Sequence, residues 1–133
     1  MKQVILCLAV FALSCNKHIR PTTAVVNGNP MLLGKIDKHQ LEQAPFSDWY
    51  KKEYAAYHPD TSTTDSLRSL VSSYRYEIFF GTWCGDSKRE VPRLLKLLDE
   101  LHIKPTLIAV GNHDTLYKQS PDHEERGKNI RRV

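Results

Sequence analysis

Residues 76–87, with the sequence YEIFFGTWCGDS, decide which fold is expected for this chain. The mainly apolar positions 76–80 predict a strand, and the apolar pattern of positions 91–101 predicts a helix that begins near Cys84. A cysteine at a helix start lies close to free backbone N–H groups and to the positive end of the helix dipole, which favour its thiolate. The stretch therefore indicates thiol chemistry, although Ser87 stands where a dithiol enzyme has its second cysteine.

The segments around this stretch predict an α/β fold. Residues 106–110 form a second strand, which is apolar throughout and is therefore expected to be covered on both faces of a sheet. A strand, a helix and a strand at this spacing predict a βαβ unit with parallel strands. Pro92 lies inside the helix of that unit and is expected to kink it, because its ring removes a backbone N–H. The other expected elements are a strand at 31–36, a helix between Ser47 and Pro59, and helices at 65–73 and 121–130.

The helices at 47–58 and 65–73 are expected to pack on the core. The first carries an aromatic stripe along one face, which favours a core position over the alternative of a ligand platform. The stripe consists of Phe46, Trp49, Tyr50, Tyr54 and Tyr57. The second helix is expected to bury Leu67, Leu70 and Val71.

The N-terminus has the pattern of an export signal. Lys2 provides a basic start, residues 4–13 are continuously apolar, and Ser14 precedes Cys15. The apolar run is too short for a stable membrane-spanning helix. The small residue before Cys15 resembles a bacterial lipoprotein cleavage site, where Cys15 would become the lipidated N-terminus; a plain secretory signal is the alternative. We expect an exported protein of the cell envelope, anchored to a membrane by lipid and facing the periplasm.

Export would divide the chain into three parts. These are a signal peptide (1–14), a lipidated N-terminus with a polar tether (15–30) and a single domain (31–133). Removal of Cys7 with the signal and lipidation of Cys15 would leave Cys84 as the one free thiol. An unpaired cysteine is unusual in an oxidising compartment, which favours a functional role for this thiol.

Charge and histidine content give little support for nucleic-acid or metal binding. The formal charge is +4, and the densest basic run, residues 126–132, contains no aromatic residue to stack on bases. We therefore expect a solvated surface there and no nucleic-acid partner. His113-Asp114 and Asp122-His123 flank one loop, but with one sulfur available we expect solvated loop residues there and no metal site. No cofactor is expected.

Four features of residues 77–101 occur together: an apolar strand, the Trp83-Cys84 pair, a Cys-x-x-Ser frame, and Pro92 eight residues beyond the cysteine. In this combination the chain resembles the thioredoxin superfamily, particularly its envelope thioredoxin-like proteins, in which the frame is Cys-x-x-Cys. The resemblance implies a thioredoxin-like fold with a parallel βαβ core. It also implies an active site, whose catalytic residues would be Cys84, Ser87 and Trp83 and whose supporting residues would be Gly85, Asp86, Lys88 and Pro92.

The chain departs from that family in two places. Ser87 replaces the cysteine that would resolve a mixed disulfide. In the family, a cis-proline, a β-hairpin and a final helix follow the segment that here ends at Val133. We therefore expect the domain to be truncated, with the strand at 76–80 left as an exposed hydrophobic edge.

Several neighbours of Cys84 are expected to tune its thiol. The Ser87 hydroxyl can hydrogen-bond the sulfur and Lys88 adds positive charge, and both effects favour the thiolate. Asp86 opposes them as an anion within one turn of the sulfur, so the sequence leaves the sign of the net effect open. Trp83 is expected to shield one side of the sulfur, a role compatible with simple packing.

A single thiol limits the expected reactions. Cys84 can form a mixed disulfide, which only an external thiol can resolve. The expected activity is monothiol exchange, as in disulfide isomerisation, deglutathionylation or the capture of client proteins, with protein thiols and disulfides or a low-molecular-weight thiol as partners. The alternatives are a non-catalytic partner-binding module and an inactive fragment. A peroxidase is disfavoured because only Trp83 separates Thr82 from Cys84.

Overall fold

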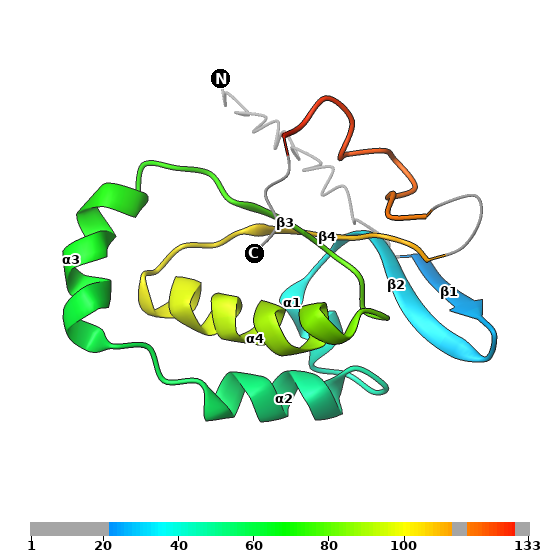
Figure 1. Cartoon of the computed structure of the whole chain (residues 1–133), viewed down its shortest axis with the longest axis horizontal. Coiled ribbons are helices and arrows are strands. Elements are labelled where there is room, and N and C mark those ends of the chain that lie inside the picture. The colour runs from blue at the N-terminus through cyan, green and yellow to red at the C-terminus, as the bar shows by residue number, and fades with distance from the viewer. Residues whose placement is uncertain (1–21, 113–116, 130–133) are drawn as a thin grey trace, which may run out of the picture.

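A four-stranded mixed sheet, in the order β1-β2-β4-β3, organises the computed structural model of the chain (Figure 1). The structure describes residues 22–112 and 117–129. In chain order the elements are β1 (Thr22–Val26), β2 (Asn29–Ile36), α1 (Lys38–Leu41), α2 (Ser47–Ala56), α3 (Thr61–Val71), β3 (Glu77–Phe80), α4 (Gly85–Glu100) and β4 (Thr106–Ala109).

The parallel pair of β3 and β4 confirms the predicted βαβ unit and the α/β class. Glu77 lies opposite Thr106 and Phe80 opposite Ala109, and α4 forms the crossover between the two strands. On its other side β4 pairs with β2 in the antiparallel direction, and β1 joins β2 as a hairpin. Among the described strands β3 therefore has one partner and forms an edge of the sheet, as expected.

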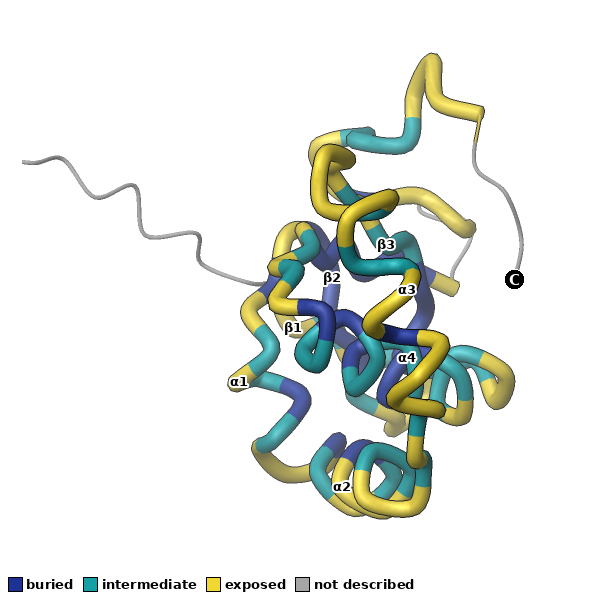
Figure 2. The backbone as a smooth tube through the Cα atoms, turned by 90° about the vertical axis from the view of Figure 1, so that its left-hand side faces the viewer, coloured by how far each residue is buried: buried dark blue, intermediate teal, exposed yellow. Residues whose placement is uncertain are grey.

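The core lies between the sheet and the helices stacked beneath it in Figure 1. Helix α4 buries one face, which includes Val91, Leu95 and Leu98, and it packs on α2. Tyr50 of α2 is buried in the same cluster and Tyr54 is partly buried against it, so the aromatic stripe is part of the core, as predicted. Buried residues, dark blue in Figure 2, concentrate on the sheet and on the parts of the helices that face it.

Polar contacts fasten α2 to α4 at the edge of this core. Arg93 donates to Glu53 over 2.6 Å and 3.1 Å. The Tyr54 hydroxyl donates to Asp99 over 2.5 Å, and Lys38 pairs with the same carboxylate. These side chains are only partly buried, so we expect them to orient the two helices more than to stabilise the fold.

The polar tether expected over residues 15–30 is wrong for residues 22–30, which form β1, a turn and the start of β2 in a β-hairpin. Asn27 has a φ of 51° and Gly28 a φ of 77°. An Asn-Gly pair adopts these left-handed backbone conformations at low cost and so joins two strands directly. Val26 pairs with Asn29 across this turn. Residues 15–21, including Cys15, lie outside the described part of the chain.

The helix expected over residues 121–130 is also wrong, because residues 121–129 form turns. The buried Ser120 hydroxyl accepts from the Glu124 N–H over 3.0 Å and donates to the Glu125 carboxylate over 2.7 Å. The same carboxylate accepts from the Ser120 N–H over 3.1 Å. These local side-chain bonds satisfy backbone groups in the way a helix would and so compete with it.

Helix α3 begins four residues earlier than the helix expected at 65–73 and packs differently. The Asp60 side chain caps it by accepting from the Thr63 N–H over 2.9 Å. Leu70, expected to be buried, is 66% exposed, whereas Thr64 is the buried residue of this helix. In Figure 1, α3 lies at one end of the molecule, beyond the layers formed by α2 and α4. Within the described ranges, none of the helices has the length and apolar character needed to cross a membrane.

Candidate functional site

Cys84 lies at the junction between β3 and α4, where the sequence predicted it. Its backbone N–H donates to the carbonyl of Gly81 over 3.0 Å, which closes a tight turn. The residue has the extended conformation of a helix N-cap, with φ −82° and ψ 127°, and its own carbonyl accepts from Lys88 over 3.0 Å. The thiol is unpaired and half-buried. It therefore stands at the positive end of a 16-residue helix and remains accessible.

The pKa of the Cys84 thiol lies below its ordinary value. The largest cause is the backbone N–H of Ser87 in the first turn of α4, with smaller contributions from the Ser87 hydroxyl and the Asp86 N–H. Burial and the charge of the Asp86 carboxylate act in the opposite direction. The structure therefore decides the sign that the sequence left open, because the backbone of the helix start outweighs the neighbouring anion.

The Ser87 hydroxyl connects the end of β3 with the start of α4. Its oxygen accepts from the Gly81 N–H over 3.4 Å. Because that contact uses a lone pair, the hydroxyl proton remains available to the Cys84 sulfur. Ser87 therefore lies where a second thiol would stand in a dithiol enzyme, but it offers the Cys84 sulfur only a hydrogen bond and no second sulfur.

The charged neighbours of the site are directed mainly toward one another. Arg89 donates to Glu90 over 2.5 Å and lies 3.4 Å from the Asp86 carboxylate. Lys88 and Arg89 are not among the main causes of the lowered thiol pKa. The expected supporting role of Lys88 therefore stays a prediction.

Trp83 is held both by a residue at the end of a neighbouring strand and by contact within its own turn. Its indole N–H donates to the carbonyl of Val110 over 3.0 Å, just beyond the end of β4. The ring also covers Gly81 so closely that a Cβ there would lie 2.5 Å from two indole atoms. Gly85 differs, because a Cβ at that position would meet none of the described atoms within 4 Å. The structure thus requires a glycine at Gly81, which the sequence analysis did not single out, although a glycine ending an apolar strand is a signal of close approach.

Pro92 is remote from the sulfur. It is fully buried in the middle of α4, which continues through it to Glu100. Eight residues of helix place it about 12 Å along the axis from Cys84. Any support that it gives the site therefore acts through the packing of α4 on the sheet.

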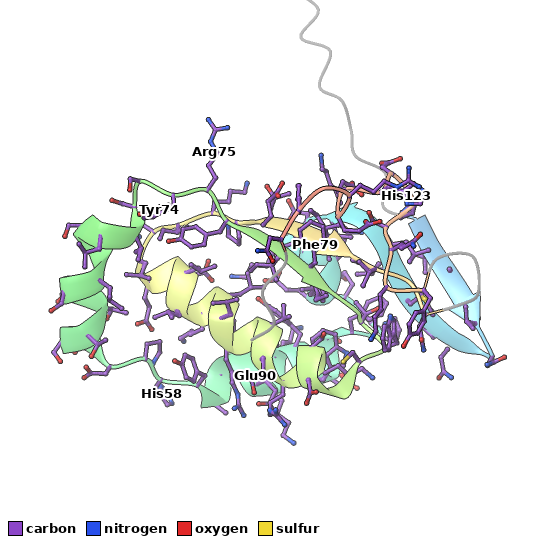
Figure 3. All side chains as sticks on the ribbon, turned by 45° about the horizontal axis from the view of Figure 1, so that its top comes forward. His58, Tyr74, Arg75, Phe79, Glu90 and His123 are labelled. Carbon is purple, nitrogen blue, oxygen red and sulfur yellow. The ribbon has the colours of Figure 1, made fainter. Side chains whose placement is uncertain are left out.

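A groove of about 1230 Å³ lies between β3 and α4, with Cys84 and Ser87 among its lining and Lys128, which pairs with Glu77 of β3, also bordering it. Phe79 on β3 and Glu90 on α4, both labelled in Figure 3, belong to the two sides of this groove. The apolar and aromatic part of its lining consists of Tyr57, Tyr74, Tyr76, Ile78, Phe79, Phe80, Val91, Leu94 and Leu97. The thiol thus opens onto a surface large enough for a polypeptide segment.

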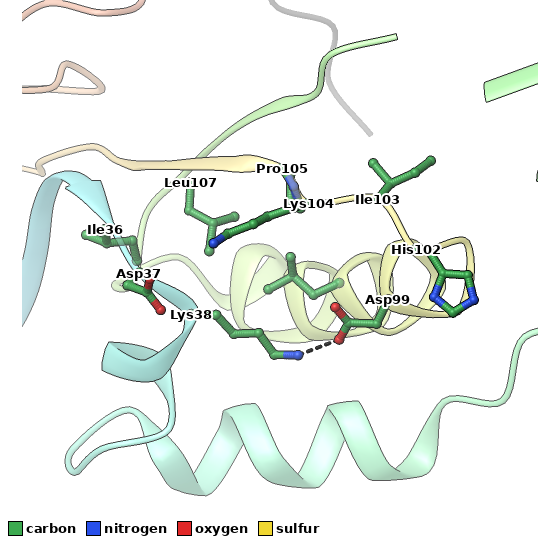
Figure 4. A pocket seen from close by; sticks show the side chains of 10 residues that line it. Ile36, Asp37, Lys38, Asp99, His102, Ile103, Lys104, Pro105 and Leu107 are labelled. Carbon is green, nitrogen blue, oxygen red and sulfur yellow. Dashed lines mark hydrogen bonds and ion pairs between the residues drawn. The ribbon is translucent and has the colours of Figure 1, made fainter. Parts of the chain in front are cut away.

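A second cavity of about 380 Å³ lies at the C-terminal end of α4 (Figure 4). Lys38 and Asp99 form an ion pair on its wall, and Asp37, His102 and Lys104 complete its polar lining. Since Cys84 lies at the opposite end of the same helix, this cavity does not contribute to the thiol site.

The loop residues considered as metal ligands do not form a site in the described part of the chain. His123 lies 3.4 Å from Glu125, whereas Asp122 is exposed. His113 and Asp114 lie outside the described residues. No group of three histidine, cysteine or acidic side chains suited to a metal occurs within residues 22–112 and 117–129.

No family model matches the chain, and neither the curated proteins nor the solved structures include a match. The chemistry of this site is therefore inferred from its own residues and geometry.

The contrast between Gly81 and Gly85 predicts opposite effects of the same substitution. Gly81→Ala should destabilise the protein by about 1–3 kcal/mol, because the new methyl group would overlap the Trp83 indole. Gly85→Ala should be neutral or stabilising by up to about 1 kcal/mol, because it lies in open space in the first turn of a helix. Urea unfolding of both variants measures the difference, and equal stabilities would contradict the close packing of the indole.

Ser87 and Asp86 have opposite effects on the thiol, so substitutions of these two residues should move the pKa of Cys84 in opposite directions. Ser87→Ala removes a hydroxyl that lowers the pKa and should raise it, although the backbone N–H at that position remains. Asp86→Asn removes a charge that raises the pKa and should lower it further. The rate of iodoacetamide alkylation, measured against pH, gives the pKa of the thiol in each variant. The measurements are made in a Cys7→Ser/Cys15→Ser background, in which Cys84 is the one thiol. Shifts of the same sign in both variants would refute this account of the site.

Proposed function

We propose that this protein is a thioredoxin-like thiol–disulfide exchange protein that acts through Cys84 alone. The observation that carries the proposal is the position of Cys84 as the N-cap of α4, with a thiol that is accessible and has a lowered pKa. A larger thiolate fraction near neutral pH makes such a cysteine a competent nucleophile. A structural cysteine buried in apolar surroundings would have the opposite property.

The reaction consists of two exchange steps. The Cys84 thiolate attacks one sulfur of a substrate disulfide, forms a mixed disulfide with it and releases the other sulfur as a thiolate. An external thiolate then attacks the substrate sulfur of the mixed disulfide, forms a new disulfide with the substrate and releases Cys84 as the thiolate. The protein ends as it began, and the substrate has exchanged one thiol partner for another. Ser87 lacks a thiol and cannot perform the second step.

The arrangement of β3, α4 and β4 supports the finer assignment to a thioredoxin-like fold. Trp83 and Cys84 lie in the turn that follows a parallel strand, and the crossover helix begins at the residue after Cys84. In a thioredoxin-like sheet, further strands cover the edge that β3 presents here. On this proposal the groove beside β3 belongs to the region that such strands would occupy.

A partner-binding module without catalysis is the second candidate. The observation that favours it is the apolar groove between β3 and α4, which could hold a polypeptide without any reaction at Cys84. The two candidates differ in what they require of the thiol. Thiol–disulfide exchange requires a reactive Cys84 thiol, whereas the binding of a partner does not depend on the reactivity of this thiol.

Mixed-disulfide formation tests the exchange reaction. In the Cys7→Ser/Cys15→Ser background, the folded protein should react with a glutathionylated peptide at neutral pH several-fold faster than the same chain unfolded in urea. Once the thiol released in this step has been removed by desalting, the adduct should persist until reduced glutathione is added, because the chain holds no second thiol. Intact-protein mass spectrometry follows both steps.

Two variants sharpen this test. Cys84→Ser should form no adduct. Ser87→Cys should release the peptide as its thiol without an external thiol, because the new sulfur three residues away can attack the Cys84 sulfur and form an intramolecular disulfide with it. A folded protein that reacts no faster than the unfolded chain would leave the binding module as the better explanation.

We also propose that the protein is exported and anchored through Cys15. The pattern of residues 1–15 supports this, although these residues lie outside the described part of the chain. Expressed in a bacterium that processes lipoproteins, the full chain should incorporate a clickable fatty-acid analogue, and Cys15→Ser should abolish the label. Cys7→Ser is the matched control and should retain it. Secretion of an unlabelled wild-type chain would indicate a plain secretory signal.

A further inference from the structure

The turn that carries Cys84 has two central residues, Thr82 and Trp83. The turn begins at Gly81, immediately after β3, and the hydrogen bond from the Cys84 N–H to the Gly81 carbonyl closes it. Connecting segments are ordinarily more mobile than the strands and helices that they join. The direction of the Cys84 side chain therefore depends on what holds the two central residues.

Thr82 is tied to β2. Its side chain is 2% exposed, and its hydroxyl oxygen accepts from the backbone N–H of Leu32 over 3.1 Å. Leu32 lies two residues before Gly34, where the pairing of β2 with β4 ends in the described sheet. The hydroxyl thus gives the Leu32 N–H the acceptor that β4 no longer supplies. Leu32 is itself 3% exposed, so loss of that acceptor would leave a buried donor unpaired, at a cost of about 1–3 kcal/mol.

Trp83 is tied to the other neighbouring strand. Its indole N–H donates to the Val110 carbonyl over 3.0 Å, and the Val110 N–H donates to the Phe80 carbonyl over 2.9 Å. The two central residues of the turn are therefore held by two different strands. With both anchors in place, the turn cannot rotate about the end of β3 without breaking a hydrogen bond.

This restraint matters because the helix N-terminus acts over a short range. Its effect on a charge falls off within the first turn, so a small displacement of the sulfur from the Ser87 N–H weakens the stabilisation of the thiolate. Trp83 is held by its close packing on Gly81 as well as by its hydrogen bond. Thr82 has one polar anchor, formed with a residue 50 positions away in the sequence.

We propose that Thr82 is a positioning residue for Cys84, whose hydroxyl fastens the turn to Leu32 of β2 and so holds the sulfur at the start of α4. The inference rests on the proposed exchange function of Cys84 and adds a residue that the motif itself does not contain. The proposed role requires the hydroxyl group of Thr82 and not only the shape of its side chain.

Three substitutions distinguish an effect on the position of the Cys84 sulfur from an effect on the stability of the fold. Thr82→Val keeps the shape of the side chain and removes the acceptor; Thr82→Ser keeps the acceptor and removes a methyl group. Thr64→Val is the matched control, because Thr64 is also a buried threonine, but its hydroxyl donates to carbonyls of its own helix start over 2.9 Å. Each is made in the Cys7→Ser/Cys15→Ser background, and iodoacetamide alkylation is measured against pH together with urea unfolding.

Thr82→Val should alkylate several-fold more slowly than the parent near neutral pH, and its profile should move to higher pH. Above the pKa of the thiol the two rates should converge, which excludes a simple change in access. Thr82→Ser and Thr64→Val should keep the parental profile, whatever stability they lose. A parental profile in Thr82→Val would overturn the proposal.

Amide hydrogen exchange covers the case in which Thr82→Val does not fold. The Leu32 amide of the parent and of Thr82→Ser should be protected as strongly as the β2 amides paired with β4. Rapid exchange of that amide, or a shifted alkylation profile in Thr82→Ser, would overturn the proposal. A parental thiol with an ordinary pKa would instead contradict the exchange function, so the two failures are distinguishable.

Discussion

The parallel pairing of β3 with β4 is the constraint on which the thiol site depends. Because parallel neighbours must be joined by a crossover, the chain leaves β3, turns once and enters α4. The turn places Cys84 at the N-cap of that helix, with its sulfur beside the backbone N–H groups of the first turn. Helix α4 is in turn held by its buried face against the sheet and by α2. The position of the sulfur thus follows from packing of the whole unit.

In this arrangement, backbone N–H groups are what lower the pKa of the Cys84 thiol most. The N–H of Ser87 is the largest cause of the lowered thiol pKa, and the Asp86 carboxylate beside it does not reverse the effect. A backbone donor at a helix start is fixed by the helix itself, whereas a charged side chain at the surface is screened and mobile. The proposed monothiol chemistry uses this fixed donor.

Much of the fold could be predicted because its signals are local. The apolar strands at 76–80 and 106–110 and the periodic helix between them occur within one or two residues of the predicted bounds. The hairpin at 22–30 was missed although Asn27-Gly28 is a strong turn signal, since the polar composition around it favoured a tether. The helix expected at 121–130 was wrong because the Ser120 hydroxyl and its acidic neighbours bond the backbone locally. Leu70 was assigned to the core by period alone, but no layer covers that face among the described residues.

The sequence alone determined the strand, the turn and the helix around Cys84, and the absence of a second thiol at Ser87. These features depend on residue type, period and spacing within about 25 neighbouring positions. Only the tertiary structure decided the sign of the thiol pKa shift, the need for a glycine at Gly81 and the contact of Thr82 with Leu32. That contact joins residues 50 positions apart. Such properties depend on which distant backbone groups meet in the fold, and no local pattern in a single sequence records them.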